Sequence, residues 1–213
     1  MKTSCDVLKV SATDPEPDII AAAVHVIGNG GVIAFPTSGL YGLGADALNP
    51  EAVSRIFRIK RRPLHKPILL LVKDVRDLSR IVREVPPAAE KLMNAFWPGG
   101  LTLVFNARDT LPGVLTGRSG KIGVRIPIHP VARALVGRLK SPLTGTSANL
   151  SEGPGCNDIS MLDADVAAHL ELILDAGPLK GGPGSTVVDV TVSKPLILRE
   201  GSVAGRQIKA LLA

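Results

Sequence analysis

The chain contains little of what a metal site or a disulfide scaffold needs. Its two cysteines, Cys5 and Cys156, lie far apart, and no Cys-x-x-Cys pair occurs in the sequence. The histidines are scattered, at positions His25, His65, His129 and His169. Structural zinc sites need closely spaced Cys and His ligands, and disulfide-rich domains need many cysteines. The sequence therefore argues against a zinc site and gives no sign of an oxidising compartment.

Aromatic residues and long apolar runs are also scarce. Aromatic residues make up 3% of the chain, which argues against base stacking as the main means of recognition. The longest apolar runs, such as residues 68–72, are far shorter than the roughly 20 residues that cross a bilayer. Residues 1–10 lack an apolar core of signal-peptide length. We therefore expect a cytoplasmic protein with no membrane partner.

Several catalytic motifs are missing as well. The sequence has no Gly-x-x-x-x-Gly-Lys-Ser/Thr phosphate loop, no Rossmann glycine fingerprint and no serine nucleophile elbow. It has no dense carboxylate cluster for metal ions and no Cys–His pair with supporting context. Any chemistry should therefore act by positioning reactants and stabilising charge, without a nucleophile from the protein.

What remains is the composition of an ordinary globular protein with a basic excess. Of the 213 residues 45% are hydrophobic and 21% are charged, and 25 Lys and Arg against 19 Asp and Glu give a formal charge of +6. This excess suits an anionic ligand such as a nucleotide, or a nucleic acid, and does not choose between them.

Strand and helix signals intermix along the chain, without an internal repeat or a low-complexity linker. Apolar runs predict strands at residues 32–35, 68–72, 101–105, 122–126, 172–174, 186–190 and 196–198, with another entered at Leu143. Spacing, proline and cap signals predict helices beginning near residues 17, 50, 74, 87 and 130, and a last one capped by Ser202. We predict an α/β (mixed α+β) fold: a single domain over residues 1–213, with its core at about residues 15–201. Its centre is a twisted, open, mixed β-sheet with helices on both faces.

The rest of the chain is organised around residues 30–46. The apolar run at 32–35 predicts a buried strand, which ends at Pro36 because proline lacks a backbone donor. We predict that a loop follows, carrying glycines, the hydroxyls of Thr37 and Ser38, and the phenol of Tyr41. Glycines let a backbone approach a ligand closely, and hydroxyls at a strand end make a polar site. The alternative is a plain tight connection between a strand and a helix.

The helix that begins after the Asn49 cap ends in a basic segment. Lys60 lies at the end of its apolar face, four residues after Ile56, so its side chain points toward the body of the protein. A lysine stem that carries its ammonium out to water is the alternative. Arg55, Arg58 and Arg62 share the opposite face, where solvated charges are the usual outcome. Because Pro63 disfavours helix at the preceding residue, we place Arg62 in a loop.

Polar clusters recur at the predicted strand ends. They comprise Thr37 with Tyr41, Lys60 to Lys66, Lys121 with Arg125, residues 144–151, Ser185 with Thr186, and Arg199. A strand arginine among apolar neighbours needs an anionic partner, because burying an unpaired guanidinium is very costly. For Arg125 and Arg199 that partner is either a carboxylate of the protein or a ligand. Together the clusters suggest a pocket for a polyphosphate.

Seven short motifs in a fixed order resemble one known family. They are Pro36-Thr37 to Leu43, Lys60 to Pro63, Trp97-Pro98-Gly99, Arg125-Ile126-Pro127, Ser147-Ala148-Asn149, Ser185-Thr186-Val187 and Arg199-Glu200-Gly201. The same order is typical of the YrdC-like threonylcarbamoyl-AMP synthases, and here it spans residues 30–201. The chain is identified as a member of this family and resembles its short, single-domain form.

The resemblance implies a YrdC-like fold, a nucleotidyltransferase reaction and a set of partners. L-threonine, bicarbonate and ATP would give L-threonylcarbamoyl-adenylate and pyrophosphate, with Mg²⁺ accompanying ATP and no metal fixed by the protein. The product would pass to the transferase complex that modifies adenosine 37 of tRNA. The match implies that Lys60, Lys121, Ser147, Asn149 and Arg199 hold ATP. Thr37, Tyr41, Arg62, Arg125 and Ser185 would hold threonine and bicarbonate, and Lys60 and Arg62 would stabilise charge in the reaction.

Residues 38 and 39 depart from the family pattern. Most members carry an acidic residue and a threonine there, whereas this chain has Ser38 and Gly39. The amino acid could therefore be held differently, and a Gly39→Thr variant is expected to tighten threonine binding or leave it unchanged. Three alternatives stay open. One is a paralogue that accepts another acyl acceptor, and another is the carbamoyl-adenylate chemistry of hydrogenase-maturation carbamoyltransferases. The third is a module that binds double-stranded RNA or tRNA through the basic run of residues 55–66.

Overall fold

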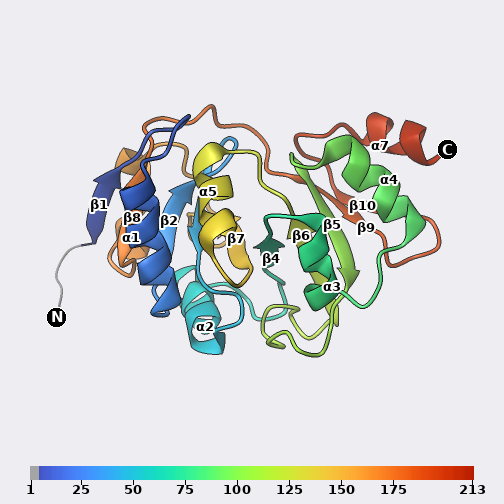
Figure 1. Ribbon diagram of the computed structural model, residues 1–213, viewed down its shortest axis with the longest axis horizontal. Coiled ribbons are helices and arrows are strands. Elements are labelled where there is room, and N and C mark those ends of the chain that lie inside the picture. Colours follow the sequence, from blue (N-terminus) through green and yellow to red (C-terminus); the bar gives the residue numbers. More distant parts are fainter. Residues whose placement is uncertain (1–4) are drawn as a thin grey trace.

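The computed structural model describes residues 5–213. All ten strands of this part join one sheet (Figure 1), in the order β1-β8-β2-β3-β7-β4-β6-β5-β9-β10. The strands are β1 Asp6–Lys9, β2 Ile33–Pro36, β3 Tyr41–Gly44, β4 Leu69–Leu71, β5 Leu101–Asn106, β6 Lys121–Arg125, β7 Leu143–Ser147, β8 Leu172–Asp175, β9 Thr186–Asp189 and β10 Leu196–Arg199.

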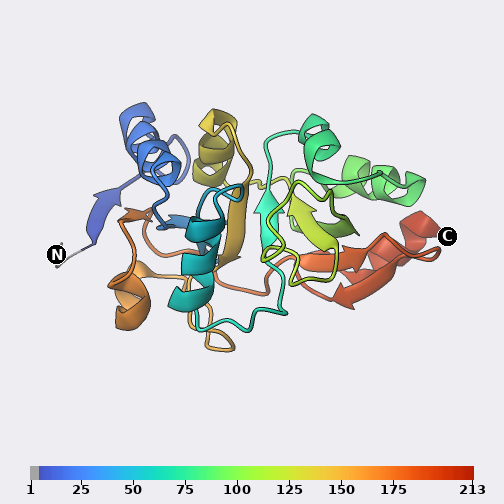
Figure 2. The same cartoon turned by 90° about the horizontal axis from the view of Figure 1, so that it is seen from below.

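The sheet is mixed, as predicted. The pairs β1–β8, β2–β8, β4–β6 and β5–β9 are parallel, and the other neighbours are antiparallel. The helices are α1 Pro17–Gly28, α2 Pro50–Ile59, α3 Leu78–Ile81, α4 Pro87–Phe96, α5 Pro130–Arg138, α6 Ala164–Ala167 and α7 Gly205–Leu212, with 3₁₀ turns at Val75–Asp77 and Ile159–Met161. Figure 2 shows α1, α5, α3 and α4 on one side of the sheet and α2 and α6 on the other, which confirms helices on both faces.

Helix α2 begins and ends as its sequence indicates. The side chain of Asn49 accepts hydrogen bonds from the backbone N–H groups of residues 51 and 52, and Pro50 occupies the first helical position, where no donor is missed. Val53, Ile56 and Phe57 are buried in the core. The helix ends at Ile59, and Arg62 lies in the following loop, as predicted from Pro63. The inward face of α2 therefore delivers Lys60 to the interior.

The predicted loop over residues 41–44 is wrong, because Tyr41–Gly44 forms strand β3. It pairs with β2 on one side and β7 on the other. Glycine is required here by packing: a Cβ at Gly44 would lie 2.8 Å from the ring of Phe35, and one at Gly42 would lie 3.2 Å from the carbonyl oxygen of Thr146. Glycine has a low intrinsic preference for strands, so the sequence of this segment does not predict one. The two neighbouring strands impose the extended conformation.

The predicted cap of the last helix is also wrong. Ser202 does not cap α7, since its hydroxyl donates to the carbonyl oxygen of Gly100. Instead Gln207, in the first turn of α7, accepts from the backbone N–H of Ala204. The hydroxyl of Ser202 therefore ties the segment before α7 to the start of β5.

Candidate functional site

The turn between β2 and β3 forms one wall of the candidate site. The backbone N–H and the hydroxyl of Thr37 both donate to the carbonyl oxygen of Leu40, at 3.0 and 2.5 Å. The tip is held from outside by the N–H of Gly181, which donates to the carbonyl oxygen of Gly39 at 2.9 Å. A Cβ at Gly39 would lie 2.3 Å from the carbonyl oxygen of Gly181. This geometry contradicts the expectation that Gly39→Thr is tolerated, because any side chain must push the two loops apart.

Tyr41 supports this wall from beneath. The residue is fully buried, and its hydroxyl donates to the carbonyl oxygen of Gly177 at 2.7 Å and accepts from the N–H of Ala176 at 3.0 Å. Burial raises the pKa of Tyr41 to about 12, so the phenol stays neutral. The structure thus places the polar atom of Tyr41 against the segment that follows β8, where it positions that segment.

Lys60 joins α2 to the loop after β7. Only 1% of the residue is exposed, and its ammonium donates to the carbonyl oxygens of Ser147 and Asn149, both at 2.6 Å, and to Oδ1 of Asn149 at 3.1 Å. Burial, and secondly the charge of Arg62, lower the pKa of Lys60 to about 7. Three acceptors need three N–H donors, which only the charged ammonium has. The snorkelling alternative is therefore wrong: Lys60 is an interior cation that orders residues 147–149.

The loop after β7 has further internal contacts. The hydroxyl of Ser147 donates to Oδ1 of Asn149, whose side-chain amide donates to the carbonyl oxygen of Gly153 at 2.6 Å. The N–H of Ser151 donates to the carbonyl oxygen of Lys60 at 2.8 Å. Within residues 5–213, Oγ of Ser151 is a buried side-chain polar atom without a hydrogen-bond partner. Buried polar atoms without a partner are rare in folded proteins. Ser151 belongs to the polar cluster predicted at residues 144–151, although none of the seven motifs includes it.

Arg62, in the loop after α2, adds a second positive charge close to Lys60. Its Nε and Nη2 donate to the carbonyl oxygens of Lys66 and Pro67, at 3.0 and 2.8 Å. Burial lowers the pKa of Arg62 from its ordinary value. Two carbonyl acceptors orient the guanidinium and leave its positive charge uncompensated. Lys60 and Arg62 are thus close enough to repel each other, which is the Coulombic contribution felt by Lys60.

Arg125 and Arg199 form a second cationic pair. Nε of Arg125 donates to the carbonyl oxygen of Gly99 at 2.6 Å, and its Nη2 donates to the hydroxyl of Ser38 at 3.0 Å. Burial, and secondly the charge of Arg199, lower the pKa of Arg125 to about 10. Arg199 donates from Nε and Nη2 to the carbonyl oxygen of Ser185, at 3.2 and 2.7 Å. The hydroxyl of Ser38, which departs from the family pattern, is thus part of the site and accepts from Arg125.

Ser185 lies beneath this pair. Its hydroxyl is buried and shares a hydrogen bond of 2.8 Å with the hydroxyl of Thr102 on β5. Thr102 has no motif of its own in the sequence and was missed for that reason. Ser185 directly precedes β9, and its carbonyl oxygen accepts from Arg199.

Lys121 does not join the other cations. It begins β6, whereas Arg125 ends the same strand. Its ammonium forms an ion pair of 2.8 Å with Asp189, at the end of β9. The structure therefore gives Lys121 a partner within the protein and separates it from Arg125 by the length of the strand.

The turn at residues 37–40 connects the two cationic groups. It contacts Arg125 through Ser38, while the strand that follows it pairs with β7, Gly42 lying opposite Ser147. Within residues 5–213 none of the four side chains Lys60, Arg62, Arg125 and Arg199 forms an ion pair with a carboxylate. The carboxylate alternative for Arg125 and Arg199 is thus wrong for this part of the chain. Lys60 is buried, Arg62 and Arg125 are partly buried, and Arg199 is exposed. Cations whose protein acceptors are all neutral make a site for anions.

Metal ligands are not part of this arrangement. In the part of the chain that the structure describes, no group of three or more His, Cys, Asp or Glu side chains could hold a metal ion. The same residues include no helix long and apolar enough to cross a membrane.

Comparison with known proteins identifies the origin of the motifs. A family model described as "Telomere recombination", for the Sua5/YciO/YrdC domain, matches residues 25–201. The chain belongs to the Sua5/YciO/YrdC family. A threonylcarbamoyl-AMP synthase of Pyrococcus abyssi is 36% identical over 193 residues, which cover 91% of this chain and 57% of that protein.

Solved structures of the family have the same fold. Sua5 of P. abyssi, solved in complex with L-threonine, matches with a TM-score of 0.92 and 35% identity over 97% of this chain and 60% of that one. YciO of E. coli matches with a TM-score of 0.86 and 29% identity over 94% of this chain and 97% of that one. The chain spans 57% of the length of the P. abyssi synthase and 58% of a Bacillus subtilis one. Family membership and the YrdC-like fold predicted from the motifs are confirmed.

Proposed function

We propose that this protein is an L-threonylcarbamoyl-adenylate synthase, a nucleotidyltransferase that uses ATP, bicarbonate and L-threonine. The observation that carries the proposal is the set of four cations, Lys60, Arg62, Arg125 and Arg199, without a carboxylate partner within residues 5–213. Relatives that carry the name threonylcarbamoyl-AMP synthase, and the Sua5 structure with L-threonine, support the same activity.

The reaction suits a site of this kind. The amine of threonine and bicarbonate give a carbamate and water, and a carbamate oxygen then attacks the α-phosphorus of ATP while pyrophosphate leaves. Both reactants are anions, so cations must bring them together and stabilise the charge on the phosphoryl oxygens. No nucleophile from the protein is needed. Mg²⁺ would arrive with the triphosphate, which supplies oxygen ligands of the kind that this ion prefers.

The geometry supports a division of labour between the two cationic groups. Arg125, with Thr37 and Ser185 nearby, would hold the carboxylate of threonine and its carbamate, and Arg62 would bridge toward the phosphates. Residues 147–149 and Arg199 would hold ATP. Because all three N–H groups of Lys60 already have acceptors, we assign Lys60 to positioning the loop that holds ATP.

Besides Lys60, two further assignments change from those implied by the motifs. The hydroxyl of Tyr41 is engaged by the backbone of residues 176 and 177, so it would shape the threonine site without touching the substrate. The ammonium of Lys121 is engaged by Asp189, so a contact with ATP would first require that ion pair to open. Delivery of the adenylate to a tRNA-modifying complex, and direct binding of tRNA or double-stranded RNA, remain predictions of the resemblance. The same holds for location in the cytoplasm.

The test is an assay with defined omissions. The protein is incubated with ATP, Mg²⁺, bicarbonate and L-threonine, the adenylate is detected by mass spectrometry, and pyrophosphate is measured separately. We expect both products only when threonine and bicarbonate are present together. Cleavage of ATP to AMP at the same rate without threonine would contradict the proposal. Adenylate formation with another amino acid, but not with threonine, would identify a paralogue with a different acceptor.

A further inference from the structure

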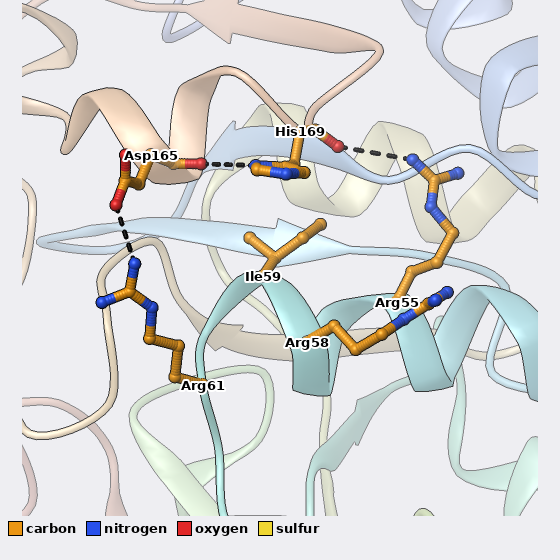
Figure 3. A pocket seen from close by; sticks show the side chains of 6 residues that line it. All are labelled: Arg55, Arg58, Ile59, Arg61, Asp165 and His169. Atoms are coloured by element: carbon orange, nitrogen blue, oxygen red, sulfur yellow. Dashed lines mark hydrogen bonds and ion pairs between the residues drawn. The ribbon is translucent and has the colours of Figure 1, made fainter.

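A second basic pocket lies on the outer face of α2, away from the candidate site. It is a cavity of about 550 Å³ lined by Arg55, Arg58, Ile59, Arg61, Asp165 and His169. Figure 3 shows the arginines rising from α2 and the turn after it, with α6 and His169 across from them and Ile59 between. None of the proposed substrate-binding residues lines this cavity. The cavity is therefore separate from the candidate site, and a ligand bound there would not depend on the proposed function.

The arginines of the pocket differ in how firmly they are held. Arg55 forms an ion pair of 2.5 Å with Glu171 and donates to the carbonyl oxygens of Gly30 and His169. Its guanidinium group is therefore already bound within the protein. Arg58 has no side-chain hydrogen bond or ion pair with any residue of the described chain, 5–213. It is free to bind a ligand.

Arg61 is held only by an exchangeable contact. Its ion pair with Asp165 measures 2.9 Å, and the two side chains are 71% and 66% exposed. Exposed pairs of this kind contribute only about 0–1 kcal/mol to stability, so a stronger anion can replace the carboxylate. Arg61 also has a φ of 49°, in the left-handed region that is uncommon for residues other than glycine. The backbone conformation turns this residue out of the line of α2, toward α6.

His169 adds a further polar atom with a defined role. Its Nδ1 lies 2.7 Å from the carbonyl oxygen of Asp165. A carbonyl oxygen only accepts, so Nδ1 carries the proton, and Nε2 is left as an acceptor that can take a hydrogen bond from a hydroxyl group of a ligand. Two guanidinium groups and one imidazole nitrogen thus surround a space with an apolar side chain, Ile59, at its base.

We propose that this pocket binds a small organic phosphate, with the phosphate on Arg58 and Arg61 and the organic part over Ile59. A phosphate monoester carries about −1.5 to −2 charges at neutral pH and three acceptor oxygens, and guanidinium groups bind it with paired hydrogen bonds. The cavity lies within the range of about 300–1,000 Å³ that small ligands occupy. Ile59 belongs to the hydrophobic core and is only 7% exposed, so it is the volume of the cavity that leaves room for a sugar or an aliphatic chain beside the phosphate.

A small ligand suits the pocket better than a nucleic-acid backbone. The cavity is closed on one side by α6, and it carries a carboxylate, Asp165, with the carboxylate of Glu171 next to Arg55. A polyanion that follows a groove gains from an uninterrupted row of cations. Here Arg58 and Arg61 reach to opposite sides of Ile59 (Figure 3), and carboxylates interrupt the row of cations. RNA is therefore the alternative that the experiment must distinguish.

The experiment measures binding of ribose 5-phosphate and phenyl phosphate to the full chain by titration calorimetry, with inorganic phosphate for comparison. We expect saturable one-to-one binding that weakens roughly ten- to a hundredfold in an Arg58→Ala/Arg61→Ala variant, as for lost charge-assisted contacts. Asp165→Asn should tighten binding by about two- to fivefold, because it releases Arg61 and removes a negative charge. The matched control is Arg76→Ala/Arg83→Ala, which removes two cations from exposed ion pairs elsewhere and should bind as the parent does.

Three results would overturn the proposal. The first is no saturable binding of either organic phosphate at millimolar concentration. The second is equal weakening in the control variant, which would indicate a general charge effect. The third is loss of binding in Arg125→Ala while the Arg58→Ala/Arg61→Ala variant binds as the parent does, since the ligand would then occupy the candidate site. A short RNA duplex that binds with steep salt dependence through Arg58 and Arg61, while both small phosphates fail, would assign the pocket to RNA and likewise reject the proposal.

Discussion

Replacing Lys60 by methionine removes a buried ammonium and the three hydrogen bonds that it donates to residues 147 and 149. The pKa of Lys60 falls from an ordinary value of 10.5 to about 7 in the folded protein. By linkage this difference corresponds to about 5 kcal/mol against the charged form in the fold. The cost exists because the side chain leaves water almost completely and has Arg62 beside it.

The sign of the pH effect follows from the lowered pKa. Between pH 7 and pH 10.5 the unfolded chain keeps the proton of Lys60 while the folded chain releases it, so the free energy of unfolding rises with pH. From pH 7 to pH 9 this contribution amounts to about 2 kcal/mol. It should be present in the parent protein and missing in Lys60→Met. Lys91→Met, which removes an exposed lysine, should keep the parent's pH dependence.

Catalysis should change in the opposite direction over the same range. A neutral amine has two N–H groups for three acceptors, so one contact to the loop at residues 147–149 is lost as the pH rises above 7. We therefore expect kcat/KM for pyrophosphate release to fall above pH 7 while stability increases. Urea unfolding at pH 7, 8 and 9 measures the first quantity, and the coupled pyrophosphate assay measures the second. If the unfolding free energies of the parent and Lys60→Met run parallel from pH 7 to pH 9, Lys60 does not titrate there and the reasoning is refuted.

Three further predictions address the rest of the site. Arg125→Ala should lower kcat/KM by roughly ten- to a hundredfold, as expected for a lost charge-assisted contact. The control Arg133→Ala, on an exposed face of α5, should keep kcat/KM near that of the parent, and equal losses in both variants would indicate a diffuse electrostatic effect. Gly39→Ala should weaken threonine binding and lower the melting temperature, because its Cβ would lie 2.3 Å from the carbonyl oxygen of Gly181; unchanged binding by calorimetry would show that the two loops separate freely. Thr186→Val should cost about 2–4 kcal/mol of stability, because the buried hydroxyl makes three backbone hydrogen bonds; a loss below about 1 kcal/mol in urea unfolding would contradict this.

Local signals in the sequence were sufficient for several elements. Asn49 and Pro50 predict the start of α2 because a cap acts on neighbouring backbone groups, and the structure places both as expected. The apolar run at residues 32–35 predicts β2, which forms at Ile33–Pro36. The motif order predicts the family and the YrdC-like fold. These features depend on residues close in sequence, or on a pattern shared by the family.

Contacts between distant segments decided the remainder. The sequence places Lys60 at the inner end of α2, but its acceptors lie 87 and 89 residues away, so its burial could not be foreseen. Lys121 and Arg125 share a strand and look alike in sequence, yet only Lys121 meets a carboxylate, 68 residues further along the chain. The second basic pocket is likewise lined from distant segments, since Asp165 lies 104 residues from Arg61. Side-chain charge is a property of the sequence, whereas the partner that neutralises it is chosen by the packing of the sheet and its helices.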